Sequence, residues 1–82
     1  MNTDQKRAAL RVIKEHSGCV DCGVKYPYYV LQFDHRPVTY KVDKLSRLIS
    51  NASWDDVLTE IEKCDIVCGN CHAIRGHNRR VQ

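Results

Sequence analysis

Two pairs of cysteines in this 82-residue chain have the spacing of metal ligands. Cys19 and Cys22 form one CxxC pair, and Cys68 and Cys71 form the other. A two-residue gap lets both thiolates of a pair point at one tetrahedral ion, and two such pairs complete a four-sulfur structural Zn²⁺ site. The alternatives are two disulfides or four unrelated buried thiols. We favour zinc, because a reducing compartment opposes disulfides and an odd number of cysteines leaves one unpaired.

The fifth cysteine, Cys64, stands outside both pairs. It follows a predicted helix and adjoins a predicted strand. Its preferred interpretation is a small buried hydrophobic residue, and an exchangeable zinc ligand is the alternative.

Three other ionisable residues have the types and positions of a hydrolytic site: Asp34, His35 and His72. Asp34 and His35 follow an apolar run, where the hydrophobic pattern gives no reason for adjacent ionisable groups. A carboxylate and a neutral imidazole suit a divalent ion of intermediate hardness, and a second imidazole suits a general base acting on water. The alternative is an Asx-type turn that enters Pro37, with His72 capping a helix. The residues alone leave the two hypotheses about even.

The hydrophobic pattern predicts the elements that must position these residues. We expect a helix at residues 6–16, with Thr3 or Asp4 as its N-cap and Ser17-Gly18 as its end. Ser53 and Asp56 resemble a capping box at the start of the clearest helix. The remaining expected elements are strands at 28–33 and 65–67 and helices at 44–50, 53–63 and 72–80.

The composition bounds the class of protein. A chain of this length holds one hydrophobic core, so we expect a single domain over residues 1–82. With 43% hydrophobic residues, it needs a metal or disulfides to stabilise the fold. It has no apolar run of about 20 residues and no secretory signal pattern in residues 1–16, so we expect a cytoplasmic protein without a membrane anchor.

Three segments, in this order, resemble the motifs of the HNH nuclease family: LQFDHRP at residues 31–37, EIEKC at 60–64 and VCGNCH at 67–72. The closest likeness is to the small zinc-containing branch found in bacterial and phage genomes. The resemblance implies an α+β fold with a ββα-metal core (HNH/His-Me finger) over residues 19–80. The N-terminal helix, residues 1–17, would be an addition, and residues 44–63 would be a helical insertion between the two core strands.

The resemblance also implies a reaction, the metal-dependent hydrolysis of DNA phosphodiester bonds to 5′-phosphate and 3′-hydroxyl ends. His35 matches the general base that activates water. Asp34 and His72 match the two ligands of a catalytic divalent ion, which would be Mg²⁺ or another ion such as Mn²⁺, Ni²⁺ or Zn²⁺. The chain departs from the pattern at the middle Asn, which orients the loop of the base, because Lys63 stands there.

Basic residues that flank the motifs are candidates for contacts with DNA phosphates. A structural zinc site with four thiolates would lower the net charge from +3 to about +1, so local clusters of arginine carry more weight than the total charge. The alternative is that the terminal arginines only solubilise the chain end. The candidates are Arg36, Lys41, Arg75, Arg79 and Arg80.

Two classes of function therefore remain. The first is an endonuclease of low sequence specificity, with DNA and, in some members of the family, phage packaging proteins as partners. The second is a non-catalytic zinc-ribbon module that binds nucleic acid or protein, which would have no use for Asp34, His35 and His72 together. His77 lies about 140° around a helix from His72, so it is a poor third ligand unless Gly76 distorts the helix. The oligomeric state is left open.

Overall fold

The computed structural model describes residues 1–37 and 43–81. Within these residues the chain forms four α-helices, one 3₁₀ turn and one two-stranded antiparallel sheet, which confirms the predicted α+β class. No helix in the described part of the chain has the length and apolar character needed to cross a membrane. The elements in order are α1 (Thr3–Ser17), η1 (Tyr28–Val30), β1 (Leu31–His35), α2 (Leu45–Asn51), α3 (Trp54–Ile61), β2 (Cys64–Cys68) and α4 (Gly69–Arg80).

The sheet joins two strands that are distant in the sequence. Leu31 pairs with Cys68 at one end of the sheet, and His35 pairs with Cys64 at the other. The helices α2 and α3 are inserted between the two strands, as predicted, and α4 follows β2 without a loop.

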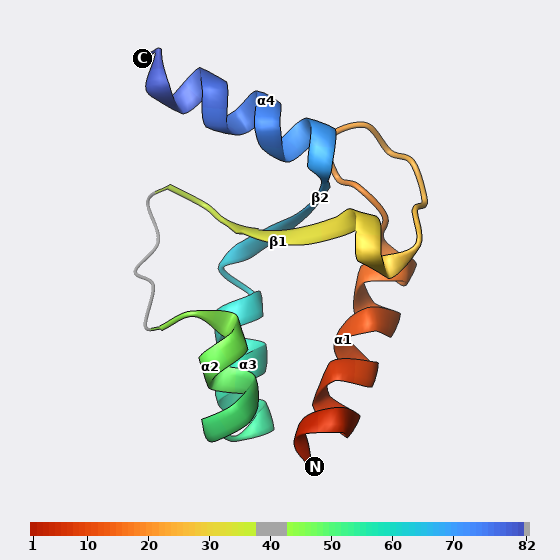
Figure 1. Ribbon diagram of the computed structural model, residues 1–82, viewed down its shortest axis with the longest axis vertical. Helices are drawn as coiled ribbons and strands as arrows, with labels where there is room; N and C mark the ends of the chain where they lie inside the picture. The colour runs from red at the N-terminus through yellow and green to blue at the C-terminus, as the bar shows by residue number, and fades with distance from the viewer. Residues whose placement is uncertain (38–42, 82) are drawn as a thin grey trace.

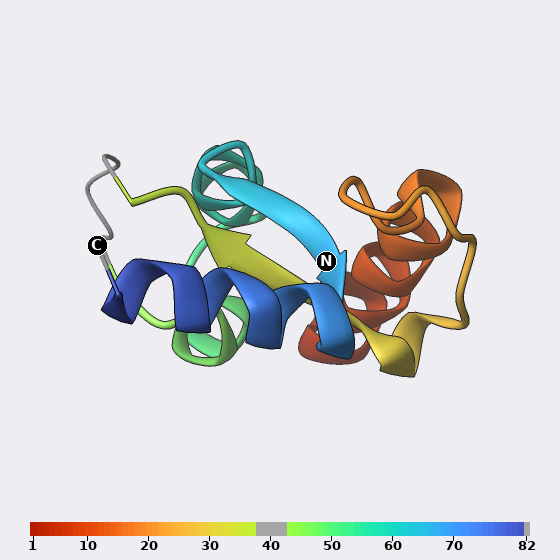
Figure 2. The ribbon, with the colours of Figure 1, turned by 90° about the horizontal axis from the view of Figure 1, so that it is seen from above.

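The two faces of the sheet are covered by different helices. Helix α4 lies along one side, whereas α1, α2 and α3 lie on the other (Figures 1 and 2). Because consecutive side chains of a strand point to opposite faces, Gln32 and Asp34 face α4, whereas Leu31, Phe33 and His35 face the other three helices. Neighbouring residues of β1 therefore belong to different environments.

The core lies where the sheet meets the cysteine pairs. Leu31, Ile66 and Val67 are buried together with Cys19 and Cys68. Ile13 from α1 and Phe33 pack against this cluster. The hydrophobic core and the candidate metal site therefore share residues, so each depends on the other.

The ends of helix α1 have specific caps. Its N-cap is Asn2, so the prediction of Thr3 or Asp4 is wrong. The Asn2 side chain accepts a hydrogen bond from the Gln5 N–H at 2.8 Å, and the Gln5 side chain accepts one from the Asn2 N–H at 2.9 Å. Gly18 ends the helix as predicted, with a φ of 66° that favours glycine.

The predicted strand at residues 28–33 is wrong in its first half. Tyr28–Val30 forms a 3₁₀ turn in which the Val30 N–H bonds to the Pro27 carbonyl at 3.0 Å. The strand begins only at Leu31, because Leu31 pairs with Cys68, the last residue of β2. The chain enters α4 at Gly69, so residues before Leu31 have no further β2 residue to pair with. Strand β1 then continues through His35, two residues further than predicted.

The other elements differ from the predictions by a few residues at their ends. Ser53 caps α3 as predicted, accepting the Asp56 N–H at 3.2 Å. Helix α3 ends at Ile61, helix α2 includes Asn51, strand β2 extends to both flanking cysteines, and α4 begins at Gly69.

Lys6 joins the N-terminal helix to the inserted helices. Its side chain is buried, and Nζ donates hydrogen bonds to the carbonyl oxygens of Ala52 at 2.6 Å and Ile49 at 3.3 Å. These carbonyls lie at the end of α2, where a helix has unpaired acceptors and favours positive charge. Lys6 therefore fastens α2 to α1.

Candidate functional site

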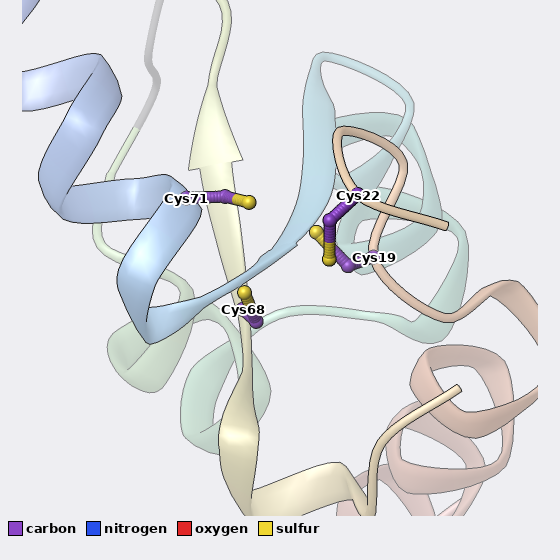
Figure 3. A group of neighbouring side chains, drawn as sticks. All are labelled: Cys19, Cys22, Cys68 and Cys71. Atoms are coloured by element: carbon purple, nitrogen blue, oxygen red, sulfur yellow. The ribbon is translucent and has the colours of Figure 1, made fainter. Parts of the chain in front are cut away.

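The four cysteines of the two CxxC pairs come together in space (Figure 3). One sulfur from each lies within 4.8 Å of every other, and all four are free of disulfides. Four sulfurs at the Zn–S distance from one tetrahedral ion would lie about 3.8 Å apart, so only a small adjustment is needed. Cys19, Cys22, Cys68 and Cys71 thus form a potential metal site that is compatible with structural zinc.

The backbone sets the positions of these sulfurs. The first pair lies in a tight loop, in which the Gly23 N–H bonds to the Cys19 carbonyl at 2.8 Å. The Val20 N–H bonds to the Ile66 carbonyl at 2.9 Å and attaches this loop to β2. The second pair spans the junction of β2 and α4. A metal here would hold the loop, the sheet and α4 together.

The acidities of the thiols fit a site that needs a cation. Desolvation opposes ionisation of Cys19, but backbone hydrogen bonds outweigh it and lower the pKa of this thiol to about 6. Desolvation and the neighbouring cysteine sulfurs raise the pKa of Cys71 to about 12. One thiolate is therefore stabilised by the fold, whereas full ionisation of the cluster needs positive charge among the sulfurs.

Cys64 stands apart from this cluster. Its Sγ donates to the Glu60 carbonyl at 3.5 Å, and desolvation together with the Glu60 charge raises its pKa to about 11. Among the described residues it belongs to no group of potential metal ligands. The structure thus favours a half-buried packing residue over an exchangeable zinc ligand.

The Asp34 carboxylate lies between β1 and α4 and is 6% exposed. Arg79 donates to Oδ1 at 3.1 Å and to Oδ2 at 2.9 Å, and Arg75 donates to Oδ2 at 3.1 Å. Nε2 of His72 lies 3.8 Å from Oδ1. Burial would raise the pKa of the Asp34 carboxyl, but the bonds from Arg79 and Arg75 outweigh it and lower this pKa.

Arg75 connects this carboxylate to two others. It makes a two-pronged contact with Asp21 of the first cysteine loop, at 2.6 and 2.7 Å, and also donates to Asp65 at 3.0 Å. These hydrogen bonds raise the pKa of Arg75, so its charge is fixed. Arg75 therefore joins the cysteine loop, β1, β2 and α4.

On the other face of the sheet, His35 contacts a buried acid. Its Nε2 lies 2.6 Å from Oε2 of Glu60 in α3. The second Glu60 oxygen accepts a hydrogen bond from Nζ of Lys63 at 3.0 Å. Burial opposes ionisation of Glu60, but the bonds from Lys63 and His35 outweigh it and lower its pKa.

The structure thus brings together some of the predicted site residues and separates others. Asp34 and His72 are neighbours. The neighbouring His35 imidazole points to the α3 side, and no contact in the described residues links it to Asp34. Arg36 lies against the protein, donating to the Cys64 carbonyl at 3.3 Å, to Asp65 at 3.2 Å and to the Glu62 carbonyl.

Two further candidates for DNA contact are Arg80 and Lys41. Arg80 is exposed near the end of α4. Lys41 lies outside the described residues.

The Asp34 carboxylate and the His72 imidazole are suitable ligands for a weakly held divalent ion. One carboxylate and one imidazole can hold such an ion while water and phosphate oxygens complete its shell. In the described residues, only the four cysteines bring three or more potential ligand residues together. An ion at Asp34 and His72 must therefore compete with Arg79 and Arg75 for the carboxylate oxygens.

Three acidic residues of this region were not singled out from the sequence: Asp21, Glu60 and Asp65. Glu60 had a detectable signal, because it shares the buried face of its predicted helix with Val57, and a carboxylate on such a face needs a partner. Asp65 is the cross-strand partner of Asp34, which depends on a register that the sequence does not specify.

Comparisons with known proteins found no relative that could indicate a function. No family model matches the chain, and neither a curated protein nor a solved structure was found to be similar to it.

Proposed function

We propose that this protein is a metal-dependent endonuclease that hydrolyses DNA phosphodiester bonds on an HNH-type ββα-metal core. The observation that carries the proposal is the 3.8 Å approach of His72 to the buried carboxylate of Asp34, between β1 and α4. The neighbour of Asp34 in the sequence, His35, is held by a second carboxylate. The four cysteines beside α4 would bind one structural Zn²⁺ ion and keep His72 next to β1.

Asp34 and His72 would hold the catalytic divalent ion, which is Mg²⁺ or another ion such as Mn²⁺. When bound, this ion supplies Lewis-acid stabilisation of charge on the phosphate and on the leaving oxygen. Asp34 is suited to this role because its lowered pKa keeps it ionised at neutral pH. The His72 side chain is 46% exposed, so substrate can approach it.

His35 would act as the general base on water. Its Nε2 is engaged by Glu60, so Nδ1 is the nitrogen that accepts the proton. His35 and Asp34 are adjacent at the end of β1 but face opposite sides of the sheet, so the attacking water and a phosphate bound at Asp34 would have to meet beyond the end of the strand.

The basic residues of α4 would bind phosphate. Arg79 has Asp34 as its partner in the described structure, and a DNA phosphate offers a similar pair of oxygens to its guanidinium group. Such contacts are independent of sequence, so we expect low sequence specificity and strong dependence on salt. The proposed setting is the cytoplasm of a bacterial or phage-infected cell, with phage packaging proteins as further partners.

A specific observation favours a second candidate, the non-catalytic zinc-ribbon module. Both oxygens of Asp34 are engaged by arginines, an arrangement that also serves a purely structural ion-pair network. In that case the protein would bind nucleic acid or a partner protein without cleaving DNA.

A plasmid assay separates the two candidates. Protein with measured zinc content is incubated with supercoiled plasmid in EDTA, Mg²⁺, Mn²⁺ or Ni²⁺, and binding to the same DNA is measured in parallel. The nuclease predicts conversion to open-circular or linear DNA with a divalent ion and none in EDTA. Binding without cleavage by zinc-loaded protein in every metal would reject the nuclease in favour of the zinc-ribbon module.

A further inference from the structure

Among the residues that the structure describes, the most deeply buried charged side chain is that of Glu60, the partner of His35. Glu60 is 1% exposed, which is less than Asp34 or Lys6. A carboxylate at this depth is costly unless its oxygens are paired. It lies in the last turn of α3, an inserted helix that contributes no residue to the cysteine cluster or to the Asp34 ion pairs.

Both oxygens of Glu60 have a defined partner. Oε2 lies 2.6 Å from Nε2 of His35, and Oε1 accepts a hydrogen bond from Nζ of Lys63 at 3.0 Å. The contact with His35 joins residues 25 positions apart, whereas the contact with Lys63 is local, one turn along the chain. Lys63 thus holds the carboxylate in place, and the carboxylate holds the imidazole.

This arrangement determines which imidazole nitrogen carries the proton. An ionised carboxylate only accepts hydrogen bonds, so the neutral imidazole must present an N–H at Nε2. The remaining nitrogen, Nδ1, is then unprotonated and able to accept a proton. A neighbouring carboxylate also stabilises the imidazolium that forms when the base takes a proton.

A role in packing alone does not account for these contacts. A buried ion pair stabilises a fold weakly compared with apolar residues of similar volume, because both charges lose their hydration. The half-buried His35 side chain, 18% exposed, can pack on β2 without a charged partner. The pairing does, however, fix the direction and the tautomer of the ring.

We propose that Glu60 is a positioning residue that holds His35 in the Nε2–H tautomer and directs Nδ1 towards the attacking water, with Lys63 anchoring Glu60. The proposal rests on the proposed nuclease function for its catalytic consequence. It also explains what takes the place of the middle Asn of the HNH pattern, since Lys63 stands at that position and acts through Glu60.

The first test reads the tautomer directly and needs no activity. Nitrogen NMR of the histidine rings is recorded over a range of pH, and the tautomer is read from the spectrum of the neutral ring. The wild-type protein should show His35 protonated at Nε2 and bare at Nδ1. Glu60→Leu removes the acceptor at similar volume and should give a mixture of tautomers. Glu60→Gln keeps an acceptor oxygen and should retain part of the wild-type preference.

The second test compares kcat with KM for DNA cleavage in the same variants. Glu60→Leu should lower kcat about 10–100-fold with little change in KM, as is usual when a supporting hydrogen bond is lost, and Glu60→Gln should recover part of kcat. The matched control is Glu62→Gln, which neutralises a neighbouring exposed acid and should leave both the spectrum and kcat unchanged.

Measured zinc content and cooperative unfolding ensure that folded proteins are compared, and Glu60→Gln serves if Glu60→Leu does not fold. The positioning role would be overturned if the His35 ring kept its full wild-type tautomer preference in folded Glu60→Leu. If only Glu60→Gln folds, full retention of that preference in Glu60→Gln would overturn it as well. If the wild-type protein does not cleave DNA, the proposed nuclease function is wrong. The NMR spectrum still decides whether Glu60 fixes the tautomer of His35.

Discussion

The guanidinium group of Arg79 occupies both carboxylate oxygens of Asp34, at 2.9 and 3.1 Å. Arg75 shares one of these oxygens but is also anchored by Asp21 and Asp65. Among the described residues, Arg79 pairs with Asp34 alone, whereas Arg75 is held by three carboxylates. If the protein acts on DNA as proposed, Arg79 would exchange Asp34 for a phosphate and leave Oδ1 of the carboxylate open to a metal ion, while Arg75 stays on Oδ2.

The first prediction concerns this competition. Removing the Arg79 side chain should tighten binding of Mn²⁺ to zinc-loaded protein roughly tenfold, because one charge-assisted pair no longer competes for Asp34. The affinity of Arg79→Ala is measured without DNA by electron paramagnetic resonance of free Mn²⁺. Arg80→Ala is the matched control, since it removes an exposed arginine next along α4. Equal Mn²⁺ affinities in the two variants would contradict the competition.

The second prediction concerns the cysteines. The chain should bind one zinc ion, and Cys68→Ser should lose both zinc and cooperative folding, because a structural zinc site contributes on the order of 10 kcal/mol to a small fold. Cys64→Ser should keep the zinc, since Cys64 lies outside the cluster. Elemental analysis and circular dichroism measure the two effects. Loss of zinc from Cys64→Ser to the same extent would show that the ligand assignment is wrong.

The third prediction concerns Lys6. Lys6→Met keeps the apolar stem but removes the donor to the Ala52 and Ile49 carbonyls at the end of α2. The free energy of unfolding should fall by about 1–3 kcal/mol, because two partly buried acceptors lose their partner. Arg7→Met, at the next and exposed position, should change it by less than about 0.5 kcal/mol. Urea unfolding of the zinc-loaded proteins gives both values.

The fourth prediction concerns pH. The pKa of Glu60 is lower in the folded protein than in the unfolded chain, so its ionised form stabilises the fold above the unfolded pKa of about 4.3. This contribution is lost as the pH falls through the folded pKa. The free energy of unfolding of the wild-type protein should therefore exceed that of Glu60→Gln. The difference should be largest near neutral pH and should shrink below about pH 4. Denaturant unfolding of both proteins across this range, with zinc content measured at each pH, gives the difference. A difference that grows in acid would contradict the sign.

The sequence predicted the elements whose signal is local. The apolar spacing in residues 53–63 and the Ser53 cap are properties of one helix, and the structure places α3 there. The equal spacing of the cysteine pairs likewise predicted that four sulfurs would meet. The conformation of Tyr28–Val30 could not be predicted in this way, because strand-forming residues become a strand only where a partner strand extends alongside them.

The arrangement of the candidate site depended on one feature that the sequence did not define, the end of β1. With the strand expected to stop at residue 33, Asp34 and His35 were free to share one loop. The strand instead runs through His35, and alternation sends the two side chains to opposite faces. Glu60 and Arg79 then become their respective partners, which only the pairing of β1 with β2 and the packing of the helices could specify.

The proposed nuclease function requires that His35, Asp34 and His72 act together in cleavage of DNA. Its most direct test measures single-turnover cleavage of a duplex by zinc-replete His35→Ala, Asp34→Ala and His72→Ala, beside His16→Ala as a control for an exposed histidine in α1. We predict that the first three lose cleavage by at least about 100-fold, as expected for loss of a general base or a metal ligand, and that His16→Ala matches the wild type. Cleavage at the wild-type rate by folded His35→Ala and His72→Ala would contradict the claim.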